Sequence, residues 1–451
     1  MSNAKPAPES VDPPGHRSSP APRRVGRLPP PSPPTWPRPE WKLLDEVPGA
    51  LGVTLWQAVR DVLLWNRISP GERAELFAPP SASTLEQRAR AVSEAPEMAG
   101  ALGELEGVAV APEVADKSRV LAACEQLWKW AESRGLHETA IQFAEAAARL
   151  EMESSSRAYT AGRLCRAVGD HQRAVVWFHR AARLARLAEP PSEIEFATAH
   201  LGWGILEHDR RNFLAAEWHF LKARGAALQR SNHSLAAAAH HNLLLVCLDA
   251  GRTQDAVKHA AHTIDLYPRK HPRIPVVACD IGYLWMKLGY FSAAIYLFSR
   301  SLRWMLVPGE RAIVLAFYAR SAAAVRDRIR FERLSERAAQ IVAQERQRAD
   351  TVLYHLGEGA RSFEQWDRAQ TLATEARSLA RARGNGTMVS LAERLLEEVT
   401  QRKPGDVDTI PEEGGNIDRI TRLVLRKLRS VPAPESLDSG TALFPEYYPL
   451  D

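Results

Sequence analysis

Apolar residues recur every three to four positions through most of the chain, a spacing that predicts amphipathic helices. Within this pattern, a small residue comes four positions before an aromatic residue or Ala, and another small residue follows three positions later. Clear copies, each just after a turn glycine, are Gly135, Ala140, Ala144, Ala147; Gly169, Ala174, Phe178, Ala181; and Gly289, Ala294, Phe298, Ser301. Because a helical hairpin cannot bury its apolar face alone, this recurrence predicts hairpins stacked on one another.

The spacing of the motif defines the extent of the predicted array. Its first small residue recurs at steps of 34, 42, 40 and 38 residues and then, after an indistinct copy, once more, at Ala140, Ala174, Ala216, Ala256, Ala294 and Ala369. Small residues let two helix backbones approach closely, and large rings fill the space between neighbouring hairpins. We therefore predict an all-α fold, an α-solenoid of about seven hairpins over residues 114–401.

The motif resembles the tetratricopeptide repeat. The matching positions are the first-helix glycines Gly162, Gly282 and Gly357, the turn glycines Gly135, Gly169, Gly251 and Gly289, the second-helix aromatics Phe178, Phe220 and Phe298, and the closing Pro268. Most steps are longer than the usual 34 residues of that family. The third unit offers two registers, Leu201-Gly202 and Trp203-Gly204, and the sixth, 309–347, loses the signature. The resemblance implies a right-handed superhelix with an inner groove.

The resemblance also implies where a partner would bind. One face of each first helix lines the inner groove in that family, and the residues at those positions here are Tyr159, Arg163, Arg166, His241, Tyr283, Met286, Tyr354 and Arg361. Aromatic rings and guanidinium groups suit an extended peptide or helix that bears carboxylates. We expect a protein or peptide partner with acidic groups; the alternative is a groove that stays solvated. We interpret four tryptophans of the array as filling packing positions or hairpin contacts, namely Trp177, Trp218, Trp304 and Trp366.

The segments that flank the array differ from it in composition. Residues 1–39 are rich in Pro, Ser and Arg and are predicted to be disordered, and 40–113 read as a small helical module or an N-terminal cap. Residues 402–415 read as a linker, 416–430 as an amphipathic basic helix, and 431–451 as a disordered aromatic tail. The basic helix suits an anionic membrane, a partner, or the exposed end of the solenoid, and we favour the last. We also hypothesise that the Tyr447-Tyr448 tail occupies the groove as an autoinhibitor.

Charge and cysteine content narrow the classes of function. The net charge of +5 is spread along the chain, so we expect no nucleic-acid partner. The four cysteines lie far apart and form no CxxC pair, which favours buried thiols in a reducing compartment. No run of about 20 apolar residues and no apolar signal core is present, so we predict a cytoplasmic protein. The excess of Arg and Ala is typical of a GC-rich, bacterial genome.

Candidate chemistry is sparse. The sequence has no phosphate-binding loop, no GxSxG elbow and no HExxH pair. His240, His241, His259 and His262 would need a further ligand from a neighbouring helix to hold a metal, so we predict no metal and no cofactor. The sequence thus favours a non-catalytic protein- or peptide-binding scaffold. The alternatives are a peptide- or ligand-sensing regulator whose superhelix changes pitch, and an enzyme with a cryptic site.

Overall fold

The computed structural model describes residues 32–33, 41–77, 81–346, 348–408 and 415–432. Every regular element within these ranges is a helix, and none is a strand. The predicted disordered segment 1–39 and the tail that holds Tyr447-Tyr448 lie outside these ranges, apart from residues 32–33 and 431–432. None of the helices in the described part is long and apolar enough to cross a membrane.

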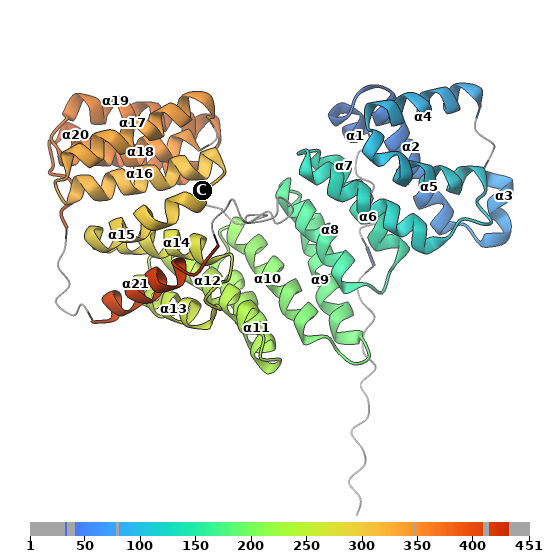
Figure 1. Cartoon of the computed structure of the whole chain (residues 1–451), viewed down its shortest axis with the longest axis horizontal. Helices are drawn as coiled ribbons and strands as arrows, with labels where there is room; N and C mark the ends of the chain where they lie inside the picture. The colour runs from blue at the N-terminus through green and yellow to red at the C-terminus, as the bar shows by residue number, and fades with distance from the viewer. Residues whose placement is uncertain (1–31, 34–40, 78–80, 347, 409–414, 433–451) are drawn as a thin grey trace, which may run out of the picture.

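Seven antiparallel hairpins follow one another along the described part of the array, as the sequence predicts (Figure 1). They are α6(Lys117–Ser133) with α7(His137–Leu150), α8(Ser155–Ala167) with α9(His171–Leu187), α10(Glu193–Asp209) with α11(Phe213–Gln229), α12(His233–Asp249) with α13(Thr253–Leu266), α14(Ile274–Lys287) with α15(Phe291–Ser301), α16(Pro308–Ala324) with α17(Arg328–Gln344), and α18(Ala349–Ser362) with α19(Trp366–Ala382). From the second hairpin on, the first helix of each hairpin also contacts the first helix of the next, which makes the array a solenoid.

Each hairpin turns through one residue with a left-handed backbone. The turn residue is glycine in four hairpins and Arg211, Arg326 or Glu364 in the third, sixth and seventh. A side chain at positive φ costs roughly 1 kcal/mol, which neighbouring packing offsets here. The missing turn glycine at Arg326, where φ is 63°, is one reason why the sixth unit loses the repeat signature in sequence. Asp, Ser and Asn side chains cap the first turns of several helices, namely Asp116, Ser154, Asp170, Ser192, Asn232 and Asp327.

In the third unit, for which the sequence offers two registers, both Gly202 and Gly204 pack against an aromatic ring. A methyl group added at Gly204 would lie 2.6 Å from the Phe220 ring of the same hairpin, and one added at Gly202 would lie 2.6 Å from Phe178 of the preceding hairpin. Trp203-Gly204 therefore occupies the family position, since Gly282 faces Phe298 of its own hairpin in the same way. The repeat alanines of the second helices are buried, as the pattern predicts.

The module before the array packs directly on the first hairpin. It contains α1(Trp41–Glu46), α2(Gly49–Arg67), α3(Arg73–Leu76), α4(Ala82–Glu94) and α5(Ala99–Val110). The Glu46 carboxylate accepts hydrogen bonds from the backbone N–H groups of Glu138 and Thr139, at 3.0 and 2.8 Å, and so caps α7. The apolar residues of the module continue the core of the first hairpins, so the module covers the N-terminal end of the solenoid.

The basic C-terminal helix does not cover the end of the solenoid, and another helix takes that position. α20(Gly386–Thr400) packs on α18 and α19 and covers the last hairpin. α21(Gly415–Leu428), which the sequence favours as that cover, instead lies across α13, α14 and α15 (Figure 1, red). Its apolar stripe is buried there: Ile417, Ile420, Val424 and Leu428. α20 covers the end of the array, and the apolar stripe of α21 is buried at the joint between the fourth and fifth hairpins.

Candidate functional site

Polar pairs join neighbouring first helices along the array, and the last pair joins α18 to the covering helix α20. We call these pairs the first-helix ladder: Glu132–Arg163, Arg166–Asp209, His208–Asp249, His241–Asp280, Arg320–Glu358 and Arg361–Glu398, with closest N···O distances of 2.5, 2.8, 2.8, 2.6, 3.6 and 3.4 Å. The residues of each pair lie about one repeat apart in sequence. The ladder therefore places alternating carboxylates and cationic or imidazole groups on one row of helices.

The structure gives each predicted groove residue a partner within the protein. Four belong to the ladder, namely Arg163, Arg166, His241 and Arg361. Tyr159 is half-buried against Phe178, and Tyr283 stacks on Phe317 with ring centroids 4.8 Å apart. The Tyr354 hydroxyl donates to Glu358 at 2.9 Å, and Met286, only 3% exposed, belongs to the core. The eight residues thus lie along one row of helices and do not converge on a single pocket.

A cluster of buried charges lies between α16 and α18. Arg320 contacts Glu358 of α18, and its Nε donates to the Asp406 carboxylate at 2.6 Å. Burial alone would lower the pKa of Arg320, but Glu358 and Asp406 outweigh burial and raise it. Burial alone would raise the pKa of Glu358, but Arg320 and Arg361 outweigh burial and lower it, which keeps the carboxyl ionised. The cluster is therefore a set of mutually neutralised ions and not a tuned acid–base pair.

The chain's own segment 403–408 lies on this cluster. The Pro404 carbonyl accepts a hydrogen bond from Arg361 at 2.7 Å, and Gly405 packs so closely on Ser362 that an added methyl would lie 2.4 Å from its Cα. Asp408 accepts the Ser292 backbone N–H at 3.1 Å and so caps α15. Residues 43, 86 and 116 positions apart in sequence thus meet through a carbonyl, a carboxylate and a helix N-terminus.

Three polar contacts hold α21 in the joint between α13 and α15. Trp285 Nε1 donates to Thr421 Oγ1 at 3.0 Å, and Trp304 Nε1 donates to the Pro432 carbonyl at 2.9 Å. The buried Lys427 ammonium donates to the carbonyls of Ile264 and Tyr267 at the C-terminal end of α13, where a cation is favoured. Burial lowers the pKa of Lys427, which Asp265 partly opposes.

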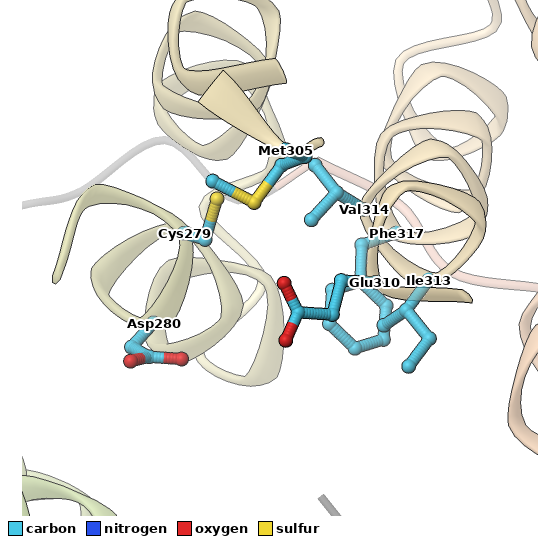
Figure 2. A pocket seen from close by; sticks show the side chains of 7 residues that line it. All are labelled: Cys279, Asp280, Met305, Glu310, Ile313, Val314 and Phe317. Carbon is cyan, nitrogen blue, oxygen red and sulfur yellow. The ribbon is translucent and has the colours of Figure 1, made fainter. Parts of the chain in front are cut away.

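A small space between α14 and α16 has a volume of about 10 Å³, enough for one water molecule (Figure 2). The Glu310 carboxylate points into it between Cys279 and Phe317. Burial raises the pKa of Glu310, and its Oε2 makes no hydrogen bond with the described residues. The space is far too small for a substrate. The described residues also contain no group of three metal-ligating side chains.

A larger cleft, which the sequence did not predict, lies between α9, α10 and α11. We call it the aromatic–basic cleft; its volume is about 430 Å³ and its lining includes His179, Arg183, Arg186, Phe196, His200, Trp203, Trp218, His219 and Lys222. His200 Nδ1 and His219 Nδ1 lie 2.8 Å apart and share a hydrogen bond. Burial lowers the pKa of His200 to about 3 and that of His219 to about 4, so both are neutral near pH 7.

Trp218 is the residue that reveals this cleft. Its side chain is 51% exposed, so it is not a core residue, although it makes a hairpin contact with His200, with ring centroids 5.6 Å apart. Trp177 and Trp304 are buried, and Trp366 is partly buried against the core. A signal was present in the sequence, because α11 carries two apolar faces. One face is buried and holds Ala216, Phe220 and Ala223; the other is exposed and holds Leu214, Trp218, Leu221 and Leu228 at spacings of four, three and seven residues. A helix with a second apolar face has surface left for another partner.

Comparison with solved structures finds similar helical proteins. The structure is similar to that of the Rap conjugation gene regulator of plasmid pLS20, solved in complex with the Phr* peptide, at 14% identity, with 81% of this chain and 98% of that chain covered and a TM-score of 0.44. RapI in its apo form (13% identity, 62% and 98% covered, TM-score 0.43) and PilF of Pseudomonas aeruginosa (15%, 64% and 99%, 0.35) are also similar. The chain resembles tetratricopeptide repeat proteins. No protein-family model matches the sequence, and no curated protein matches it.

Proposed function

We propose that this chain is a non-catalytic scaffold or adaptor that binds protein or peptide segments bearing carboxylates along its first helices, in the inner groove of the superhelix. The observation that carries the proposal is the docking of segment 403–408, in which Asp406 meets Arg320 at 2.6 Å. A non-helical segment of the chain thereby serves as an example of the ligand. The contacts need no cofactor and no bond-making step.

The chemistry of these contacts suits acidic segments. Arg320 is held between two carboxylates, Glu358 and Asp406, and only the second comes from the docked segment. Removing Asp406 would leave a largely buried guanidinium with one partner fewer, which favours the entry of another carboxylate. Further along the ladder, Arg163 and Arg166 hold carboxylates of neighbouring helices, and a ligand carboxylate would bind there by exchange.

The test releases the docked segment and measures binding of the same sequence from outside. In the variant Gly405→Ala the added methyl collides with Ser362 backbone atoms, whereas at Gly386, on α20, it meets nothing within 4 Å. A fluorescent peptide with the sequence of residues 401–408 should bind Gly405→Ala about tenfold or more tighter than the wild type, because the tethered copy no longer competes. Gly386→Ala should behave as the wild type.

Adding Arg320→Gln to Gly405→Ala should remove the gain in affinity. Circular dichroism and the denaturation midpoint check that the double variant is folded. If the peptide binds the double variant as tightly as Gly405→Ala, the Arg320 contact does not recognise carboxylates and the proposal is wrong.

One observation favours the second candidate, a peptide- or ligand-sensing regulator whose superhelix changes pitch. The buried apolar residues form two clusters that meet within α12, and α21 lies just beyond that point, across α13, α14 and α15. A ligand that displaced α21 would free the joint between the fourth and fifth hairpins, next to the point where the two clusters meet. Small-angle scattering with and without a bound peptide measures this: a regulator changes its radius of gyration, and a rigid scaffold does not.

A further inference from the structure

We infer that the aromatic–basic cleft, together with the exposed apolar face of α11, is the docking surface for the chain's own C-terminal segment 433–451. This surface lies on α9, α10 and α11 and uses none of the ladder contacts or segment 403–408. The inference is therefore independent of the function proposed above, and either can fail without the other.

The first argument is the size and exposure of the apolar surface. Leu214 is 83% exposed and Trp218 is 51% exposed, and Leu221 and Leu228 continue the same face of α11. An exposed tryptophan beside leucines is typical of a binding surface and not of an ordinary helix exterior, because a Trp side chain contributes a large contact area at low entropic cost. Trp218 links this face to the cleft, which it also lines.

The second argument is charge. Arg183, Arg186 and Lys222 line the cleft, and its lining residues include no Asp or Glu; Glu193 shares a neighbouring depression with the two arginines. The Lys222 ammonium lies over the Trp218 ring, 5.3 Å from its centroid, so a cation and an exposed ring are presented side by side. The neutral His200–His219 pair adds no charge near pH 7. The matching ligand therefore combines aromatic or apolar side chains with carboxylates.

The third argument is the composition and reach of segment 433–451. It contains four carboxylates and no Lys or Arg, and its last nine residues read Leu443-Phe444-Pro445-Glu446-Tyr447-Tyr448-Pro449-Leu450-Asp451. The segment starts at a fixed point, because Trp304 holds the Pro432 carbonyl at 2.9 Å. Nineteen residues can span up to about 60 Å. The surface on the third hairpin is two hairpins from this anchor, roughly 20–30 Å at ordinary helix spacings, so the segment reaches it easily.

The experiment measures binding of a labelled peptide of residues 436–451 to the full chain. In the variant Tyr447→Ala/Tyr448→Ala the tethered segment is weakened, so the peptide should bind this chain about tenfold or more tighter than it binds the wild type. Adding Trp218→Ala or Lys222→Glu should each reduce that affinity at least tenfold. Binding should also weaken with salt, because the charged groups are exposed.

The matched control is Lys258→Glu on α13, an exposed lysine that occupies on the fourth hairpin the position of Trp218 on the third. Circular dichroism checks that every variant is folded, which is expected for the changes at Trp218 and Lys222 because both side chains are exposed. Equal affinity for the Lys222→Glu and Lys258→Glu chains, or no peptide binding to the weakened chain, overturns the inference. A wild-type dimer that Trp218→Ala dissociates also overturns it, because a second copy would then cover the surface.

Discussion

Replacing Gly204 with Ala tests the close packing on which the solenoid depends. An added methyl would lie 2.6, 2.7 and 3.0 Å from three carbons of the Phe220 ring, whereas carbon atoms pack best at roughly 3.5–4.0 Å. Phe220 is fully buried, so its ring cannot move aside without disturbing its neighbours. Gly225, inside α11, is the matched control, because a methyl there meets nothing within 4 Å.

The magnitude follows from two opposing terms. Both substitutions gain about 1 kcal/mol from the higher helix propensity of Ala. Gly204→Ala alone also incurs the cost of overpacking, about 1–3 kcal/mol. We therefore expect Gly225→Ala to raise the free energy of unfolding by about 1 kcal/mol and Gly204→Ala to lie about 1–3 kcal/mol below it.

Urea denaturation followed by circular dichroism measures the difference, and amide hydrogen exchange locates it. Because repeat arrays can unfold in parts, exchange should rise first in α10 and α11 of the Gly204→Ala chain. Adding Phe220→Leu makes room for the methyl, so the double variant should lose less than the two single losses added together. If Gly204→Ala and Gly225→Ala are equally stable, close contact between glycine and ring does not hold the hairpins together.

Three further predictions concern α21, pH and the thiols. Lys427→Met leaves the last carbonyls of α13 without their cation, so the amide hydrogens of α21 should exchange faster. The control is Arg422→Met, on the exposed side of α21, in which exchange should stay as in the wild type. Burial lowers the pKa of His200 in the folded chain to about 3 and that of His219 to about 4, so below about pH 6.5 the unfolded chain binds more protons than the folded chain. The free energy of unfolding should therefore fall as the pH drops from about 7 to 5. A urea midpoint that stays constant over this range would contradict the prediction. Thiol reagents should label none of the four cysteines until the chain unfolds, because all are buried and burial raises the pKa of Cys124 to about 12 and of Cys247 to about 11.

Much of the fold could be predicted because its signals are local. A repeat of small and aromatic residues specifies how two adjacent helices pack, and the partners lie within one or two repeats in sequence. The motif is weaker where the structure uses other residues for the same geometry. Arg326 takes the left-handed turn conformation usually given to glycine, and the sixth hairpin forms although its motif is indistinct.

The candidate sites were harder to predict, because a pattern of apolar or charged residues does not indicate which other part of the chain these residues contact. The stripe of α21 shows that one face will be buried, but not that α13, α14 and α15 bury it. Trp218 matched a packing or hairpin position in the sequence, and only its exposure in the structure separates it from Trp177, which is fully buried. The eight predicted groove residues lie on the expected helices, while their pairing within the ladder depends on neighbours that the sequence does not identify.

The sequence by itself determined the helices and their succession as hairpins, since helix periodicity, capping residues and small-residue spacing act over a few turns of chain. Only the tertiary structure decided which charges meet, because the ladder partners lie as far apart as 43 residues and their register depends on how each hairpin rotates on the last. It also decided that segment 403–408 lies on Arg320 and that α21 fills the joint beside α14, since apolar area and charge are satisfied by any surface of matching shape.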